Sequence, residues 1–129
     1  MTLLSVLLTI KVLVTLVTIA LPFIVLPKST LDRIAGFGQP DTAFYRLYGT
    51  AVLALIVAYS GGIYQISMGI YPGAVIAMGL VSNAGATIIL IATGRVAKSL
   101  LFTLFFGAIA IGFAVAAAAP DLAMSPFGV

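Results

Sequence analysis

Four long stretches of the chain are almost wholly apolar, and short polar segments separate them. They cover residues 3–26, 45–67, 72–93 and 100–119. A helix needs about 20 apolar residues to cross the roughly 30 Å hydrocarbon core of a bilayer, and each stretch meets that requirement. The pattern therefore predicts an all-α, polytopic membrane protein, in which residues 1–129 form a single domain built as a four-transmembrane-helix bundle.

The longest polar segment is the loop at residues 27–44, which joins the first two spans. Within it, Ser29 or Thr30 could cap a short helix that carries Leu31 and Ile34 on one side. A helix of this kind would lie on the membrane surface, with its apolar side toward the lipid. A simple connecting loop is the alternative.

Lysine and arginine are unevenly divided between the segments that join the spans. Lys28, Arg33 and Arg46 lie in or beside the first loop, and Arg95 and Lys98 lie in the third. The second loop and both tails contain neither residue type. Cytoplasmic loops carry the excess of lysine and arginine. We therefore expect loops 1 and 3 to be cytoplasmic and both termini to face outward, with a bacterial inner membrane as the default location.

Composition narrows the range of functions. Of the 129 residues, 63% are hydrophobic and 7% are charged. The six basic residues are too scattered to form the basic patch that nucleic-acid binding requires. Cysteine and histidine are absent, which excludes disulfides, thiolate metal sites and histidine ligands to haem. We predict no metal site, no catalytic residue and no cofactor, and an enzyme is not the leading expectation. A bound lipid, quinone or pigment stays open.

Lys11 is the charged residue that most needs an explanation, because it lies about eight positions into the first span. A charge inside the bilayer costs a few kcal/mol and often marks a functional site. Counting along the helices places Tyr59, Ser60 and Asn83 at a similar depth, so these four residues form a candidate ligand-binding cluster. The alternatives are static packing, or a Lys11 that extends to the outer interface and meets Asp121.

Small residues recur at intervals of four in the fourth span, at Ala108, Gly112 and Ala116. The third span offers a similar series that contains Gly79 and Asn83. Rows of small side chains let helices approach closely inside a membrane. We expect these residues to mediate helix packing, either between the third and fourth spans or with a partner protein.

One segment carries a resemblance to a known family. The sequence PDTAFYRLYGTAVLALIVAY, at residues 40–59, leads from the first loop into the second span. It resembles the beginning of the second helix in DoxX-like four-helix membrane proteins, and the small-residue run from Gly79 to Gly85 is compatible with them. The resemblance implies the four-helix fold. Some members of that group are associated with quinone-linked sulfur oxidation, but no functional residue of that kind can be matched here.

Three functions remain as hypotheses. The leading one is a non-catalytic accessory or assembly subunit of a larger inner-membrane complex, such as an energy-converting one, with other membrane subunits or a second copy as partners. The second is a small carrier or binding protein for an amphiphilic or anionic solute, with its site around Lys11. The third is a quinone-linked redox membrane subunit. All three place the chain among membrane lipids, and none involves nucleic acid.

Overall fold

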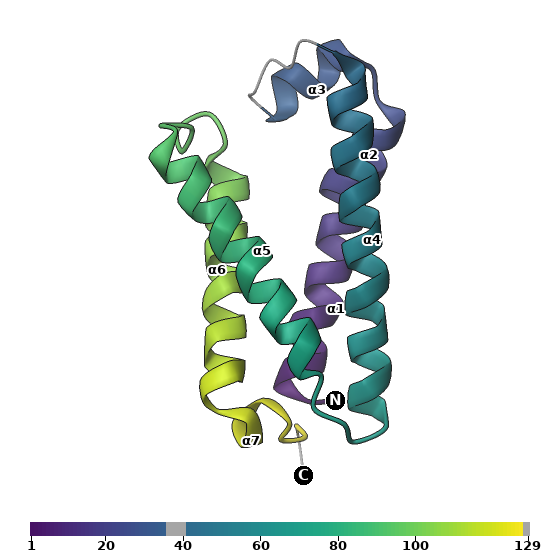
Figure 1. The fold of residues 1–129 in the computed structure, drawn as a ribbon, viewed down its shortest axis with the longest axis vertical. Coiled ribbons are helices and arrows are strands. Elements are labelled where there is room, and N and C mark those ends of the chain that lie inside the picture. The colour runs from purple at the N-terminus through teal and green to yellow at the C-terminus, as the bar shows by residue number, and fades with distance from the viewer. Residues whose placement is uncertain (36–40, 128–129) are drawn as a thin grey trace.

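The computed structural model describes residues 1–35 and 41–127, and Figure 1 shows them as an all-helical bundle. Four of its helices are long and apolar enough to cross a membrane. This confirms the predicted all-α membrane fold. The four spanning helices are Leu3–Val25, Thr42–Ser67, Gly73–Ala92 and Leu100–Ala118.

The first span is one continuous helix with three parts. These are α1 (Leu3–Thr15), a π-helical turn η1 (Leu16–Ala20) and α2 (Leu21–Val25). In the π turn the Leu21 amide donates to the Leu16 carbonyl, five residues back. The turn lies directly before Pro22, whose ring lacks an N–H and disturbs the α-helical ladder. The hydrophobic pattern gave no sign of this turn.

The remaining helices begin and end close to the boundaries predicted from the sequence. The first loop holds the helix α3 (Lys28–Ala35), so a purely irregular connection was the wrong alternative for it. Residues 36–40 of that loop lie outside the described residues. The spans α4 (Thr42–Ser67), α5 (Gly73–Ala92) and α6 (Leu100–Ala118) follow, and a short α7 (Pro120–Ala123) comes after the fourth span.

The four spans are arranged as two pairs. The first span packs along α4, and α5 packs along α6, while α4 and α5 contact each other much less. The pairs meet at the end that holds both termini and diverge toward α3 and the α5–α6 loop (Figure 1). A backbone bridge joins Thr2 to Pro126, and the Phe127 amide donates to the Met1 carbonyl at 2.8 Å.

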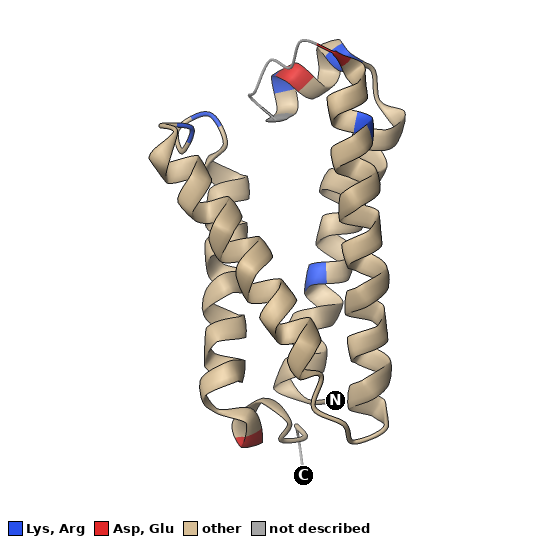
Figure 2. Ribbon diagram, viewed as in Figure 1, with Lys and Arg blue, Asp and Glu red and all other residues tan. Residues whose placement is uncertain are grey.

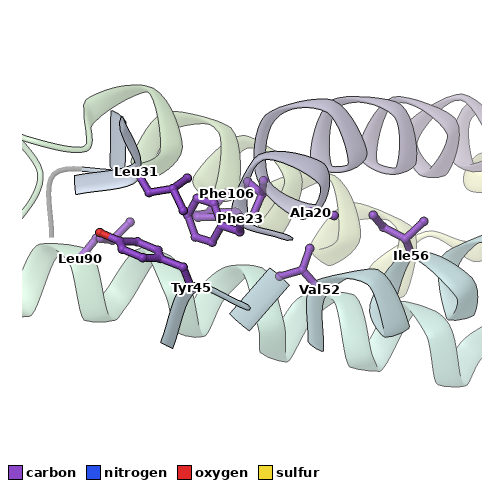
Figure 3. Close-up of a cluster of buried hydrophobic side chains, with 9 residues drawn as sticks. Ala20, Phe23, Leu31, Tyr45, Val52, Ile56, Leu90 and Phe106 are labelled. Carbon is purple, nitrogen blue, oxygen red and sulfur yellow. The ribbon is translucent and has the colours of Figure 1, made fainter. Parts of the chain in front are cut away.

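The bundle has two apolar clusters, one toward each end. The terminal-side cluster is centred on Leu4, Leu8, Tyr59, Ile76 and Phe113. In the loop-side cluster, side chains from η1, α2, α3, α4, α5 and α6 converge (Figure 3). Large apolar side chains elsewhere are exposed along every span, which suits helices surrounded by lipid rather than water. The loop-side cluster consists of Ile19, Ala20, Phe23, Leu31, Tyr45, Val52, Ile56, Leu90 and Phe106.

Charge is segregated along the bundle (Figure 2). The basic residues other than Lys11 belong to α3, the start of α4 and the α5–α6 loop, which share one end. Asp121 lies in α7 at the opposite end. At the basic end, Asp32 accepts hydrogen bonds from Lys28 and from the Tyr45 hydroxyl, both at 2.6 Å, and so ties α3 to α4. Arg46 donates to the Phe23 carbonyl at 2.7 Å, near the end of α2.

Candidate functional site

Lys11 points into the bundle rather than toward either membrane surface. Its side chain is 3% exposed, and its Nζ donates a hydrogen bond to Asn83 Oδ1 at 2.8 Å. This bond joins the first span to α5, two helices from different pairs. Asp121 is exposed on α7. The hypothesis that Lys11 extends to the outer interface and meets Asp121 is therefore wrong.

The Asn83 side chain is held in one orientation by two partners besides Lys11. Its Nδ2 donates to the Gly79 carbonyl at 2.7 Å and to the Tyr59 hydroxyl at 3.2 Å, while the backbone carbonyl of Asn83 accepts from Thr87 Oγ1 at 2.8 Å. Because both amide protons are engaged, the amide oxygen is left to face the ammonium. Lys11, Tyr59 and Asn83 thus form the cluster that their depths along the helices predicted.

Aromatic rings surround the rest of the ammonium. Nζ lies 5.0 Å from the ring centre of Phe106, 5.1 Å from that of Phe105 and 5.9 Å from that of Tyr59. Cation–π attraction at such distances offsets part of the free energy of burying the charge. Sequence reasoning assigned Phe105 and Phe106 no such role, since phenylalanine in a spanning helix usually contacts lipid or core.

Ser60 does not join the cluster. It is exposed, and its hydroxyl donates to the Ile56 carbonyl of its own helix at 2.9 Å. Adjacent residues of an α-helix point about 100° apart, so Tyr59 and Ser60 cannot face the same neighbour. Inclusion of Ser60 in the cluster was therefore wrong.

A cavity of about 710 Å³ opens beside Lys11, between the two helix pairs. All four spans contribute buried residues to its walls, whereas its exposed lining residues, among them Leu47, Ala51, Val81 and Ile89, all belong to α4 and α5. The cavity is therefore open along the seam between α4 and α5. In a bilayer that seam faces lipid. The lining residues are Lys11, Thr15, Ile19, Phe23, Phe44, Tyr45, Leu47, Tyr48, Ala51, Val52, Leu55, Tyr59, Val81, Ser82, Gly85, Ala86, Ile89, Leu90, Phe102 and Phe106.

Thr15 adds a second polar group to this cavity. It is 2% exposed, and its hydroxyl has no hydrogen-bond partner within the described structure. Thr15 follows Lys11 by four residues, so the two side chains lie one turn apart on the same face of α1. Buried hydroxyls almost always have a partner. The cavity lining therefore includes a residue whose buried hydroxyl has the capacity for a further hydrogen bond.

The four predicted packing residues have different roles. Gly79 lies against the ring of Phe113, so that a Cβ at this position would come within 2.5 Å of it. Gly112 lies similarly close to Leu7, and Ala116 is buried. Ala108 is exposed on α6. Three of the four residues are therefore used inside the bundle, and the fourth faces outward.

Comparison with protein-family models, with curated proteins and with solved structures finds no match for this chain. The resemblance to DoxX-like proteins stays a prediction. Within the described residues, no group of three or more acidic, histidine or cysteine side chains could hold a metal ion. What the geometry offers is a mostly apolar cavity with an ammonium and a hydroxyl at one end. Such an arrangement can accommodate a ligand that has one polar end and an apolar body.

Proposed function

We propose that this protein is a small membrane-embedded binding or carrier protein for an amphiphile. The polar end of the ligand binds at Lys11 and Thr15, and its apolar part fills the cavity between the helix pairs. The observation that carries the proposal is the combination of a 710 Å³ cavity with a buried ammonium and an unpartnered hydroxyl in its wall. Pockets for small organic ligands typically measure about 300 to 1,000 Å³ and combine apolar walls with a few polar groups.

The charge on Lys11 supports a ligand with an anionic or hydrogen-bond-accepting end. An ammonium has three N–H donors, and one of them is engaged by Asn83. An uncompensated charge within the bilayer is unfavourable by a few kcal/mol. A ligand that accepts a further hydrogen bond from Lys11 would offset part of that free energy, which gives the site a reason to prefer such a ligand over an apolar one.

Filling the cavity tests the proposal directly. Gly85 lies in the cavity wall with no atom within 4 Å of where a Cβ would be, so Gly85→Leu should place its side chain in the open space there. Gly61 in α4 is equally open but does not line the cavity, which makes Gly61→Leu the matched control.

The measurement is native mass spectrometry of each variant, extracted from its own membrane in mild detergent. We expect a small-molecule adduct on the wild type and on Gly61→Leu, and its loss from Gly85→Leu. An adduct that survives in Gly85→Leu would place the ligand elsewhere. If no adduct appears on the wild type, the amphiphile-binding proposal fails.

The accessory-subunit hypothesis keeps one supporting observation. Ala108 and the neighbouring Ala114 and Ala118 leave small side chains exposed on α6, where a helix of another protein could approach closely. The same mass spectra test this hypothesis, since a stable larger complex that is lost in Ala108→Leu would favour it. A quinone as the adduct would instead favour the redox hypothesis. Cytoplasmic placement of loops 1 and 3 in a bacterial inner membrane remains part of the proposal and rests on the basic residues at that end.

A further inference from the structure

We infer that the ligand is a single-chain carboxylate, which reaches the cavity sideways from the bilayer through the seam between α4 and α5. This inference rests on the proposed binding function and specifies the chemistry of the ligand. Its starting point is the pair of groups at the polar end of the cavity, Lys11 and Thr15, which lie one turn apart on α1.

The two groups suit a carboxylate because it has two acceptor oxygens. One oxygen can accept from Lys11 Nζ while the other accepts from the Thr15 hydroxyl, whose position in the cavity wall leaves it without a protein partner. A hydrogen bond between ions of opposite charge is stronger than one between neutral groups. A cationic end would be repelled by Lys11. A neutral alcohol would gain only the weaker interaction.

The depth of the site favours a carboxylate over a phosphate or sulfate ester. Lys11 lies well inside the span, and the seam that leads to it is lined by residues such as Leu47, Ala51 and Val81. A carboxylic acid can take up one proton from water at the membrane surface and cross this apolar passage as a neutral group. A phosphate ester keeps a negative charge near neutral pH, so burying it along this path would be far less favourable.

The seam itself favours a ligand that arrives from lipid. The exposed lining residues belong to α4 and α5, and small side chains at Ala51, Ser82 and Gly85 leave space along the seam between these helices. The lining residues of the first span, including Lys11 and Thr15, are all buried. A single acyl chain can lie along this seam with its carboxylate turned inward to Lys11.

The test compares three probes on the purified protein in phosphatidylcholine nanodiscs: hexadecanoate, hexadecanol and hexadecyltrimethylammonium. Occupancy is read by native mass spectrometry at matched mole fractions of probe in the bilayer. We expect hexadecanoate to reach half-occupancy at an about tenfold lower mole fraction than hexadecanol, since a charge-assisted hydrogen bond at one ligand end has this order of effect. The trimethylammonium probe should not bind.

Variants of the protein separate the contribution of the ligand's head group to binding from that of its acyl chain. Lys11→Met should raise the half-occupancy of hexadecanoate to that of hexadecanol and leave hexadecanol unchanged, and Lys11→Arg should retain part of the preference. Thr15→Val keeps the side-chain shape and removes a hydroxyl that has no protein partner. It therefore folds even if Lys11→Met does not, and it should weaken hexadecanoate severalfold more than hexadecanol.

The possible failures are distinguishable. If the wild type binds hexadecanoate and hexadecanol equally, and Gly85→Leu abolishes both, the carboxylate inference is overturned while the amphiphile-binding function stands. An unchanged preference in Thr15→Val and Lys11→Met would overturn it as well. If none of the probes binds, the proposed function fails together with the inference. If Gly85→Leu leaves hexadecanoate binding intact, the seam between α4 and α5 is not the route.

Discussion

The half of the bundle that holds the termini and the loop-side half differ in how closely their helices pack. In the half that holds the termini, glycines bring helices into direct contact, with Gly62 against Val75 and Leu8 and Gly79 against Phe113. In the loop-side half, Gly49 still packs against Phe23 within the first pair, but the two pairs diverge, and Gly85 has no neighbour within 4 Å of a Cβ position. Gly79 and Gly85 lie on the same helix, six residues apart. A glycine in a membrane helix therefore marks either close packing or open space, and the sequence alone does not distinguish the two.

The polar cluster of Lys11, Asn83 and Tyr59 lies between the half that holds the termini, where the helices are closely packed, and the loop-side half, where the pairs diverge. It joins the first span to α5 through hydrogen bonds, and Tyr59 stacks on Phe113 with ring centres 5.8 Å apart. The cluster thus belongs to the packed half through Tyr59 and to the cavity through Lys11. We expect substitutions here to have larger effects than substitutions in either half alone.

Removing the partner of the buried ammonium should have the largest effect. Asn83→Leu leaves Lys11 without its acceptor and should lower the free energy of unfolding by about 3 kcal/mol. The measurement is SDS-induced unfolding in mixed micelles, followed by circular dichroism. The double variant Lys11→Met/Asn83→Leu should recover much of the loss, because it removes the unpaired charge as well. Equal losses in the single and double variants would show that Asn83 acts through packing and not through Lys11.

Gly79 and Gly85 of α5 provide the next comparison. Gly79→Ala places a Cβ within 2.5 Å of the Phe113 ring, which is fully buried and stacked on Tyr59, so it should lower stability by about 1 to 3 kcal/mol. Gly85→Ala meets no atom and should leave stability unchanged or raise it by up to about 1 kcal/mol, since alanine favours the helix. Thermal unfolding of both variants in the same detergent checks this. Equal melting temperatures would contradict the distinction between the packed and open halves.

The smallest expected effect is at Thr15. Its hydroxyl is buried without a partner, so Thr15→Val should change the stability of the unliganded protein by less than about 1 kcal/mol, in the stabilising direction. The same unfolding measurement serves, and Thr103→Val is the control. The Thr103 hydroxyl is also buried but donates to the Ser99 carbonyl at 2.9 Å, so its loss should be destabilising. A destabilised Thr15→Val would mean that Thr15 has a partner in the folded protein.

Much of this arrangement could be predicted from the lengths of the apolar stretches and the positions of polar residues within them. The spans follow from apolar length, and the contact between Lys11 and Asn83 follows from their similar depths, because an α-helix rises by a fixed distance per residue. Depth says nothing about rotation around the helix axis. For that reason the place of Tyr59 in the cluster around Lys11 was predicted correctly, and that of its neighbour Ser60 was not.

Other features depend on how whole helices are tilted. The cavity exists because the two pairs diverge, and helix tilt is set by packing over the full length of each span. In an uninterrupted α-helix, Thr15 and Thr18 would share the face of Lys11. Thr15 lies on that face, but Thr18 is exposed, because the wider π turn rotates it away. Pro22 indicates that the helical ladder is interrupted, but not that the interruption takes the form of a π turn.

The π turn also gives the first span a point at which the helix can bend. Below it, Lys11 is anchored to Asn83. Above it, α2 carries Phe23 in the cavity wall and is held by Arg46 and α4. Helices bend most readily at such turns and at prolines, because the backbone ladder is already interrupted there. A bend at this turn would tilt α2 while Lys11 stays anchored. It would change the width of the cavity without breaking the hydrogen bond that joins the two helix pairs.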